Sequence, residues 1–355
     1  MKIFGYKIRR SVFPVLYLLF AALLFTGCNQ DGVGIFYQIS QEEAQKESKI
    51  ADLPVYQAVE VGSNLYVLAG RSIYRKSEDD WSKISSDNYV YDIVKSGGTL
   101  YANINNDDNN LDDAALWRYT GSWTKIKDYN TNVKLFTAEG GAADGYFLKK
   151  GIGGVDSVES GSAPDTMTVT HADITSLPVD AASDGTDDLL ITGDTIFGSD
   201  YSNPMAALAD PSGKSGDYTG LSTDGTLLLL TTSKGQLFSS DDGGSSWTMV
   251  EDTDGNIGSA PVQASLAVVS LGGTDYLIIG TENGYYEWEI GTADASGPTA
   301  TADTDDSSGF SATYPDLATS LVYCVLPSAL NSNVFYLGTD NGLWRRNSDG
   351  SFERL

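Results

Sequence analysis

A pair made of an apolar or aromatic residue followed by an aromatic one recurs along the chain about every 40 residues, and this repeat constrains the fold most. The pairs are Ile73-Tyr74, Leu116-Trp117, Ile196-Phe197, Leu237-Phe238, Tyr285-Tyr286 and Leu343-Trp344, with a weaker candidate at Val155. Each strong pair follows an apolar strand pattern and a short turn, and precedes a polar turn. A unit of this length buries its apolar faces only against neighbouring units, which is typical of propeller blades.

The repeat predicts an all-β fold, a β-propeller of seven four-stranded blades over residues 54–355. Closure into a ring removes the two exposed ends of the stack. Residues 34–39 are candidates for an extra strand in the last blade. In the last two repeats, Asn283-Gly284 and Asn341-Gly342 predict two-residue hairpin turns, because Asn and Gly both tolerate positive φ. A β-sandwich, or two separate β-domains, is the alternative.

One polar turn is more complete than the others. The stretch from Ser240 to Trp247 has the form Ser-x-Asp-x-Gly-x-x-Trp. Asp242 is expected to accept free backbone N–H groups of a tight turn, Gly244 to adopt positive φ, and Trp247 to cover the turn from the side. These residues resemble the Asp-box, or BNR repeat, of sialidase-like β-propellers and of Ycf48-type assembly factors. The resemblance implies a structural element and does not specify a ligand.

The N-terminus predicts export and lipidation. Basic residues precede an apolar run from Val12 to Phe25, which is shorter than a membrane-spanning helix needs. Cys28 directly follows Thr26-Gly27 and resembles the lipidated cysteine of bacterial lipoproteins. Residues 1–27 are therefore expected to be a lipoprotein signal peptide, and residues 28–53 a lipidated cysteine followed by a tether with a short helix. Asn29 after the cysteine favours the outer over the inner membrane, by analogy with diderm sorting rules.

Charge and cysteine content exclude several classes of function. The formal net charge of −26 repels nucleic acid, whose binding depends on Lys and Arg contacts to phosphates. The chain has two cysteines, and Cys28 is assigned to the lipid. Cys324 lies in an apolar run and is expected to be a buried core thiol. No disulfide framework is then available.

The sequence does not support catalysis. A sialidase holds its substrate carboxylate with three arginines, and six arginines follow the signal here: Arg71, Arg75, Arg118, Arg345, Arg346 and Arg354. All of them lie at outer-strand motifs or at the C-terminus, so no arginine triad is expected. The single histidine, His171, is expected in an exposed loop and excludes a multi-histidine metal site.

No cofactor is expected. Acidic loops at residues 105–113, 184–188, 252–255 and 303–306 leave calcium as an alternative, although solvated turns explain them better. Tyrosines that fall between the repeats could line one mouth of the ring or pack between blades, namely Tyr89, Tyr91, Tyr129, Tyr201, Tyr218 and Tyr314.

Together these features predict a lipoprotein of the bacterial cell envelope that is not an enzyme. Its propeller would serve as a scaffold for binding or assembling an unknown envelope protein or glycan. The alternatives are a glycan-acting hydrolase of sialidase-like fold and a structural surface lipoprotein without a discrete partner.

Overall fold

The computed structural model describes residues 50–77, 80–85, 89–105, 114–129, 133–138, 145–150, 158–166, 169–171, 174, 176–183, 188–199, 205–252, 261–290 and 313–355. The signal peptide, Cys28 and nearly all of the tether lie outside these residues, as do residues 34–39 and Val155. Within the described part of the chain, no helix is long and apolar enough to cross a membrane. The chain divides after Lys49, and the unit from Ile50 to Leu355 contains all the described residues.

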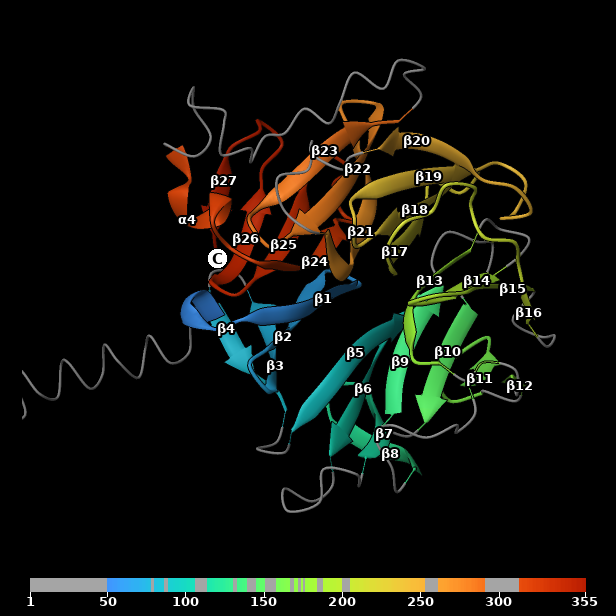
Figure 1. Ribbon diagram of the computed structural model, residues 1–355. Helices are drawn as coiled ribbons and strands as arrows, with labels where there is room; N and C mark the ends of the chain where they lie inside the picture. The colour runs from blue at the N-terminus through green and yellow to red at the C-terminus, as the bar shows by residue number, and fades with distance from the viewer. Residues whose placement is uncertain are drawn as a thin grey trace, which may run out of the picture. The chain divides into compact units, whose positions relative to one another are not determined.

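Strands make up almost all of this unit. Apart from the short helical segments η1 (Ile50–Asp52) and α4 (Pro315–Ala318), the described elements are antiparallel strands (Figure 1). They form six sheets of four strands and one sheet of three. The four-stranded sheets are β1–β4 (Val55–Val61, Asn64–Ala69, Ser72–Ser77, Asp80–Lys83), β5–β8 (Val90–Ser96, Thr99–Asn105, Ala114–Tyr119, Trp123–Asp128), β9–β12 (Val133–Ala138, Gly145–Lys150, Val158–Gly161, Val169–His171), β13–β16 (Pro178–Ser183, Asp188–Thr192, Ile196–Ser199, Ala206–Ala207), β17–β20 (Tyr218–Thr223, Leu228–Thr232, Gln236–Ser240, Thr248–Asp252) and β24–β27 (Val322–Pro327, Phe335–Thr339, Gly342–Arg346, Phe352–Arg354).

The remaining sheet corrects the prediction of seven four-stranded blades. It contains only β21 (Pro261–Leu271), β22 (Thr274–Thr281) and β23 (Tyr285–Glu289) among the described residues. The sequence after Ile290 is rich in Gly, Ala, Ser, Thr and Asp, and it lacks the alternating apolar pattern of an outer strand. The repeat predicts the number of units better than it predicts the strands within each.

The sheets form a closed circuit. The first strands of consecutive sheets contact one another in the order β1, β5, β9, β13, β17, β21 and β24, and β24 contacts β1. This is the fold of a β-propeller, as the repeat predicted. Among the strands that the structure describes, β1–β4 come entirely from the start of the unit and β24–β27 entirely from its end, so none of these sheets combines strands from both.

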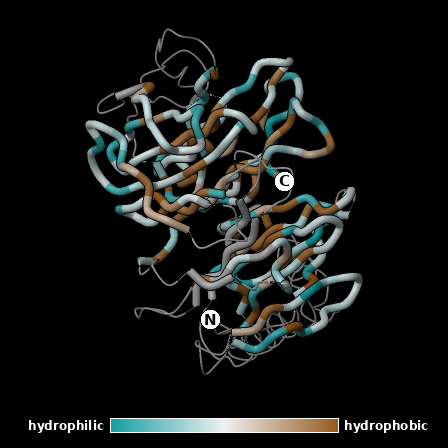
Figure 2. The backbone as a smooth tube through the Cα atoms, turned by 90° about the vertical axis from the view of Figure 1, so that its right-hand side faces the viewer, coloured by the Kyte–Doolittle hydropathy of each residue, from teal (hydrophilic) through white to brown (hydrophobic). Residues whose placement is uncertain are grey.

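The hydrophobic core is divided among the gaps between neighbouring sheets. One cluster joins Val55 and Val67 of the first sheet to Leu326 and Leu343 of the last, and similar clusters fill the other gaps. Figure 2 shows hydrophobic and hydrophilic stretches alternating along the backbone. Each fully buried aliphatic side chain of this kind contributes roughly 1.5 to 3 kcal/mol. Each sheet is therefore stabilised by its two neighbours.

Two sequence predictions about local structure are wrong. Among described residues only Ala264 has positive φ apart from glycines, so Asn283 and Asn341 do not form two-residue turns with two positive φ values. Gly284 (φ 76°) and Gly342 (φ 97°) alone adopt that conformation, each after a turn held by a threonine. His171 is the last residue of β12 and pairs with Val158, so it belongs to a strand end and not to a loop.

Candidate functional site

Six of the seven first strands have a register shift that starts at their first residue. In five of them the shift spans two residues, at Val55/Gln57, Val90/Asp92, Pro178/Asp180, Tyr218/Gly220 and Val322/Cys324, and in β21 it is longer, at Pro261/Leu266. A bulge of this kind re-aims the extra residue and increases local twist. Since the strands are antiparallel, the turn between the second and third strand of each sheet lies at the same end. These starts and turns together form one face of the ring, which we call the entry face.

Tyrosines occupy the bulged position on three consecutive first strands of the entry face. Tyr323 of β24 lies 4.9 Å from Tyr56 of β1 between ring centroids, and Tyr91 of β5 lies 4.8 Å from Tyr89. The guanidinium of Arg71 stacks on Tyr89 at 4.5 Å. We call Tyr56, Tyr89, Tyr91 and Tyr323 the tyrosine arc. Tyr56 is 39% exposed, and burial raises the pKa of Tyr323, with Tyr56 and Asp340 adding to the shift.

The side chain of the residue after the bulge accepts a hydrogen bond from a backbone amide on the first strand of the next sheet. The Ile93 amide donates to Gln57 Oε1 at 2.8 Å, and the Leu221 amide donates to Asp180 Oδ2 at 3.0 Å. The Leu135 amide donates to Asp92 in the same way, and the Ala58 amide donates to Cys324 Sγ. We call Gln57, Asp92, Asp180 and Cys324 the inner acceptor belt. These bonds link consecutive first strands, and the bond to Cys324 joins the last first strand, β24, to β1.

Burial dominates the electrostatics of this belt. Asp92 is buried, and desolvation raises its pKa from 3.8 to about 6, against the lowering effects of Lys134, Asn103, Leu135 and Gln57. Burial also raises the pKa of the Cys324 thiol to about 12, so this cysteine stays protonated at neutral pH. Cys324 packs against the cluster between the first and last sheets but is only partly buried, in partial agreement with its prediction as a core thiol.

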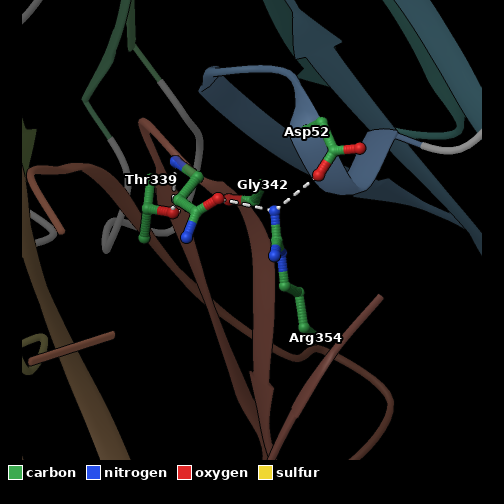
Figure 3. Close-up of polar contacts among 5 residues, drawn as sticks. Asp52, Thr339, Gly342 and Arg354 are labelled. Carbon is green, nitrogen blue, oxygen red and sulfur yellow. Dashed lines mark hydrogen bonds and ion pairs between the residues drawn. The ribbon is translucent and has the colours of Figure 1, made fainter. Parts of the chain in front are cut away.

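Arg354 of the outer strand β27 also joins the last sheet to η1, the segment just before the first sheet. Arg354 Nη2 donates to Asp52 Oδ1 at 3.1 Å and to Asn341 Oδ1 at 2.6 Å (Figure 3). Thr339 fixes the turn that carries Asn341, since its hydroxyl donates to the Gly342 carbonyl oxygen at 2.9 Å.

On the first sheet, Glu60 Oε1 accepts the Ser328 hydroxyl at 3.0 Å and Oε2 accepts the Ala329 amide at 2.6 Å. The ring is thus closed by side-chain contacts from β1 and η1.

The turn from Ser240 to Trp247 lies between β19 and β20. Ser240 Oγ donates to Asp242 Oδ1 at 2.8 Å and accepts the Gly244 amide at 2.9 Å. Asp242 accepts the Ser246 amide at 2.8 Å and the Ser246 hydroxyl at 2.6 Å, and these bonds lower its pKa.

Gly244 has φ 82°, and a Cβ there would lie 2.8 Å from Leu189 Cδ2. Trp247 packs against the adjacent core cluster. The structure therefore brings the four predicted residues together in one hydrogen-bonded turn.

The six arginines have separate surroundings. Arg118 pairs with Asp165, Arg345 with Glu353, Arg346 with Glu287 and Arg354 with Asp52, and Arg71 stacks on Tyr89. Arg75 lies beside Tyr66. Among the residues that the structure describes, no group of three or more His, Cys, Asp or Glu side chains could hold a metal ion. The four acidic loops fall almost wholly outside those residues.

The predicted inter-blade tyrosines divide into two groups. Tyr218 is fully buried, and its hydroxyl donates to Asp210 Oδ1 at 2.8 Å. Tyr314 stacks on Phe352 at 5.4 Å, and Tyr129 packs against a core cluster, so these three belong to the packing between sheets. Tyr89 and Tyr91 belong to the arc, and Tyr201 lies outside the described residues.

Sequence reasoning missed Tyr56, Tyr323 and the inner acceptor belt. A usable signal was present, because Tyr56-Gln57, Tyr91-Asp92 and Tyr323-Cys324 each place an aromatic residue before an acceptor at a strand start.

The fold and this closed circuit of sheets define the chain as a β-propeller protein, and known structures agree with that class. The structure resembles the extracellular domain of BT4673, a putative one-component system of B. thetaiotaomicron, with TM-score 0.58, 13% identity, and coverage of 82% of this chain and 38% of that one. It also resembles PorZ, a surface component of the type IX secretion system of Porphyromonas gingivalis, with TM-score 0.55, 16% identity, and coverage of 87% and 39%.

A third similar structure is the WD40 propeller domain of Doa1, with TM-score 0.57, 11% identity, and coverage of 84% of this chain and 94% of that one. The chain thus spans about two fifths of the length of the BT4673 and PorZ structures. At these identities the likeness concerns the fold. No protein-family model matches the sequence, and neither does any curated protein.

Proposed function

We propose that this chain is an exported lipoprotein whose propeller is a non-catalytic scaffold for binding or assembling another component of the bacterial envelope. Cys28 would carry the lipid, and Asn29 favours the outer membrane. The resemblance of the fold to an extracellular domain and to a bacterial surface component supports an extracytoplasmic location. The bonding within the 240–247 turn supports its resemblance to an Asp-box, as a structural element.

The tyrosine arc is the observation that carries this proposal. Tyrosine supplies a large contact area with a polar end and little loss of conformational entropy, and for this reason it is enriched in protein interfaces. Tyr56 is 39% exposed, and Leu177, at 60% exposed, directly precedes β13 on the same entry face. Arg71 adds a cation beside the arc. An envelope protein is therefore the partner class that this face fits best.

A hydrolase is less well supported by the chemistry of the described residues. Hydrolysis of a glycosidic bond requires two carboxyl groups on either side of the scissile bond. Several carboxylates of the entry face already accept hydrogen bonds within the ring: Asp92 and Asp180 accept backbone amides of neighbouring strands, Asp340 accepts the Leu321 amide, and Asp194 accepts the Thr192 hydroxyl. We therefore propose neither catalysis nor a cofactor, and calcium remains an alternative only for the acidic loops.

Site-specific photo-crosslinking in the native envelope tests the proposal. A benzoylphenylalanine residue in place of Tyr56 or Leu177 should give a discrete crosslinked product. The same residue in place of Met249, which is 44% exposed on the outer strand β20, is the matched control. Equal labelling from all three positions, or none from Tyr56 and Leu177, would favour a structural surface lipoprotein without a discrete partner.

A further inference from the structure

A cleft of about 360 Å³ opens between the three-stranded sheet and the last sheet. Its walls are Leu271, Gly272, Tyr276 and Glu287 from β21–β23, and Asn333, Arg346 and Ser348 from β24–β27 and its turns. Small-ligand sites typically have volumes of about 300 to 1,000 Å³ and combine apolar walls with a few converging polar groups. The cleft matches this description at the lower end, so its occupant would be small.

Arg346 and Glu287 form a long ion pair that is not a hydrogen bond. Arg346 Nε lies 3.7 Å from Glu287 Oε1, beyond hydrogen-bonding distance, and the two side chains are only 18% and 12% exposed. The Arg346 guanidinium also lies 5.8 Å from the Phe335 ring centroid. A guanidinium has five N–H donors in a planar fork that fits a carboxylate. Arg346 lines the cleft, and its guanidinium makes no hydrogen bond to another described residue.

The other polar groups of the cleft are held in position. Glu287 Oε1 accepts the Tyr285 hydroxyl at 3.0 Å, so the carboxylate is oriented and Oε2 remains available. Asn333 Oδ1 accepts the Gly272 amide at 2.6 Å, which orients the amide and leaves Nδ2 as a donor. The hydroxyls of Tyr276 and Ser348 add two more groups, and Leu271 with the Tyr276 ring forms an apolar wall. The cleft is thus a preformed set of opposite charges beside an apolar surface.

We propose that this cleft binds a free α-amino acid with an apolar side chain. Its carboxylate would accept from the Arg346 fork and Asn333 Nδ2, and its ammonium group would donate to Glu287 Oε2. In a free amino acid the two charges are adjacent, as they are in the cleft, whereas in a peptide they lie at opposite ends. The apolar side chain would contact Leu271 and Tyr276.

Other small ligands fit less well. A simple anion would place a second negative charge beside Glu287, and a simple cation would place a second positive charge beside Arg346, both in a largely desolvated position. A neutral sugar would use neither charge. This inference concerns a different part of the molecule from the tyrosine arc and does not depend on the proposed scaffold function.

Calorimetric titration with L-leucine tests the proposal, with isovalerate and isoamylamine as probes that each carry one of the two charges. We expect saturable binding of L-leucine, and binding of each single-charge probe that is at least about tenfold weaker. Arg346→Gln and Glu287→Gln should each weaken binding at least about tenfold, because each leaves one ligand charge unpaired. Arg345→Gln is the matched control, since Arg345 is the adjacent residue on β26 and pairs with Glu353.

The proposal is overturned if L-leucine gives no heat at millimolar concentration, or if isovalerate or isoamylamine alone binds as tightly. It is also overturned if the Arg346 and Glu287 variants, shown to be folded by circular dichroism, bind L-leucine like the Arg345 control. These outcomes leave crosslinking at Tyr56 unaffected, so failure here is distinguishable from failure of the scaffold proposal.

Discussion

Replacement of Asp92 by Asn should stabilise the protein at neutral pH and have little effect at acidic pH. Asp92 lies on β5, is only 5% exposed, and has a folded-state pKa raised from 3.8 to about 6, chiefly by burial. Asn103 Nδ2 donates to Asp92 Oδ2 at 3.5 Å. A protonated carboxyl can accept this bond and the Leu135 amide, and the carbonyl oxygen of an asparagine side chain can accept them as well.

The sign of the pH dependence follows from this shift. Between the unfolded and folded pKa values, the folded state binds more protons than the unfolded state, so the free energy of unfolding falls as pH rises through this range. A shift of about 2 pKa units corresponds to roughly 3 kcal/mol at most, at about 1.4 kcal/mol per unit. Above about pH 6, ionisation of buried Asp92 lowers the free energy of unfolding of the wild-type protein by this full amount. At pH 4 this loss of stability has largely disappeared.

Urea denaturation of wild type and Asp92→Asn at several pH values between 4.5 and 7.5 measures this effect. The many other carboxylates titrate in both proteins, so the difference between the two isolates position 92. We expect the variant to be more stable by about 1 to 3 kcal/mol at pH 7.5, and the difference to shrink towards pH 4.5. A constant difference, or a variant that loses stability specifically at neutral pH, would show that ionised Asp92 stabilises the belt and would refute this reasoning.

Three further predictions concern ring closure, the 240–247 turn and the lipid. In Gly338→Ala the new Cβ would lie 2.6 Å from Cys324 Sγ and from the Val55 carbonyl oxygen, so chemical denaturation should show a loss of about 1 to 3 kcal/mol, whereas Gly98→Ala, where no atom lies within 4 Å, should be nearly neutral. In Ser240→Ala the buried Gly244 amide loses its acceptor, which should cost about 1 to 3 kcal/mol in the same assay, and an equal loss in Ser239→Ala would argue against the assigned bond. Cys28→Ala should abolish fatty-acid labelling and release the protein from membranes, and unchanged membrane retention would contradict lipidation at this residue.

The periodicity of the sequence predicted the propeller because its signal is repeated and local. The pairs at Ile73-Tyr74 and Leu343-Trp344 lie on the third strands of their sheets, where a large side chain packs into the gap between neighbours. The bonds within the Ser240 to Trp247 turn are also local in sequence, and the residue pattern anticipated which groups would take part.

The contacts of the entry face and of the cleft join residues far apart in the chain. Ala58 meets Cys324, and Glu287 meets Arg346, only because the ring brings separate repeats together. Glu287 and Arg346 carry no distinctive local motif, and the aromatic residue before Cys324 marks a strand start without showing which strand the cysteine contacts. Sequence reasoning therefore identified the building unit and one turn, and only the folded arrangement reveals which side chains adjoin across the gaps.

Among the described strands, the first and last sheets share none, so side-chain contacts between two separate sheets close the ring. The two ends of the propeller unit lie close together, because Arg354 bonds to Asp52. A circular permutant that links these ends and begins at an exposed turn, such as Gly97-Gly98, should therefore still fold. Under the proposed lipid anchor, a pull on the chain before Ile50 would reach the propeller at η1, whose Asp52 bonds to Arg354 of the last sheet, so the contact between the first and last sheets would bear the force first.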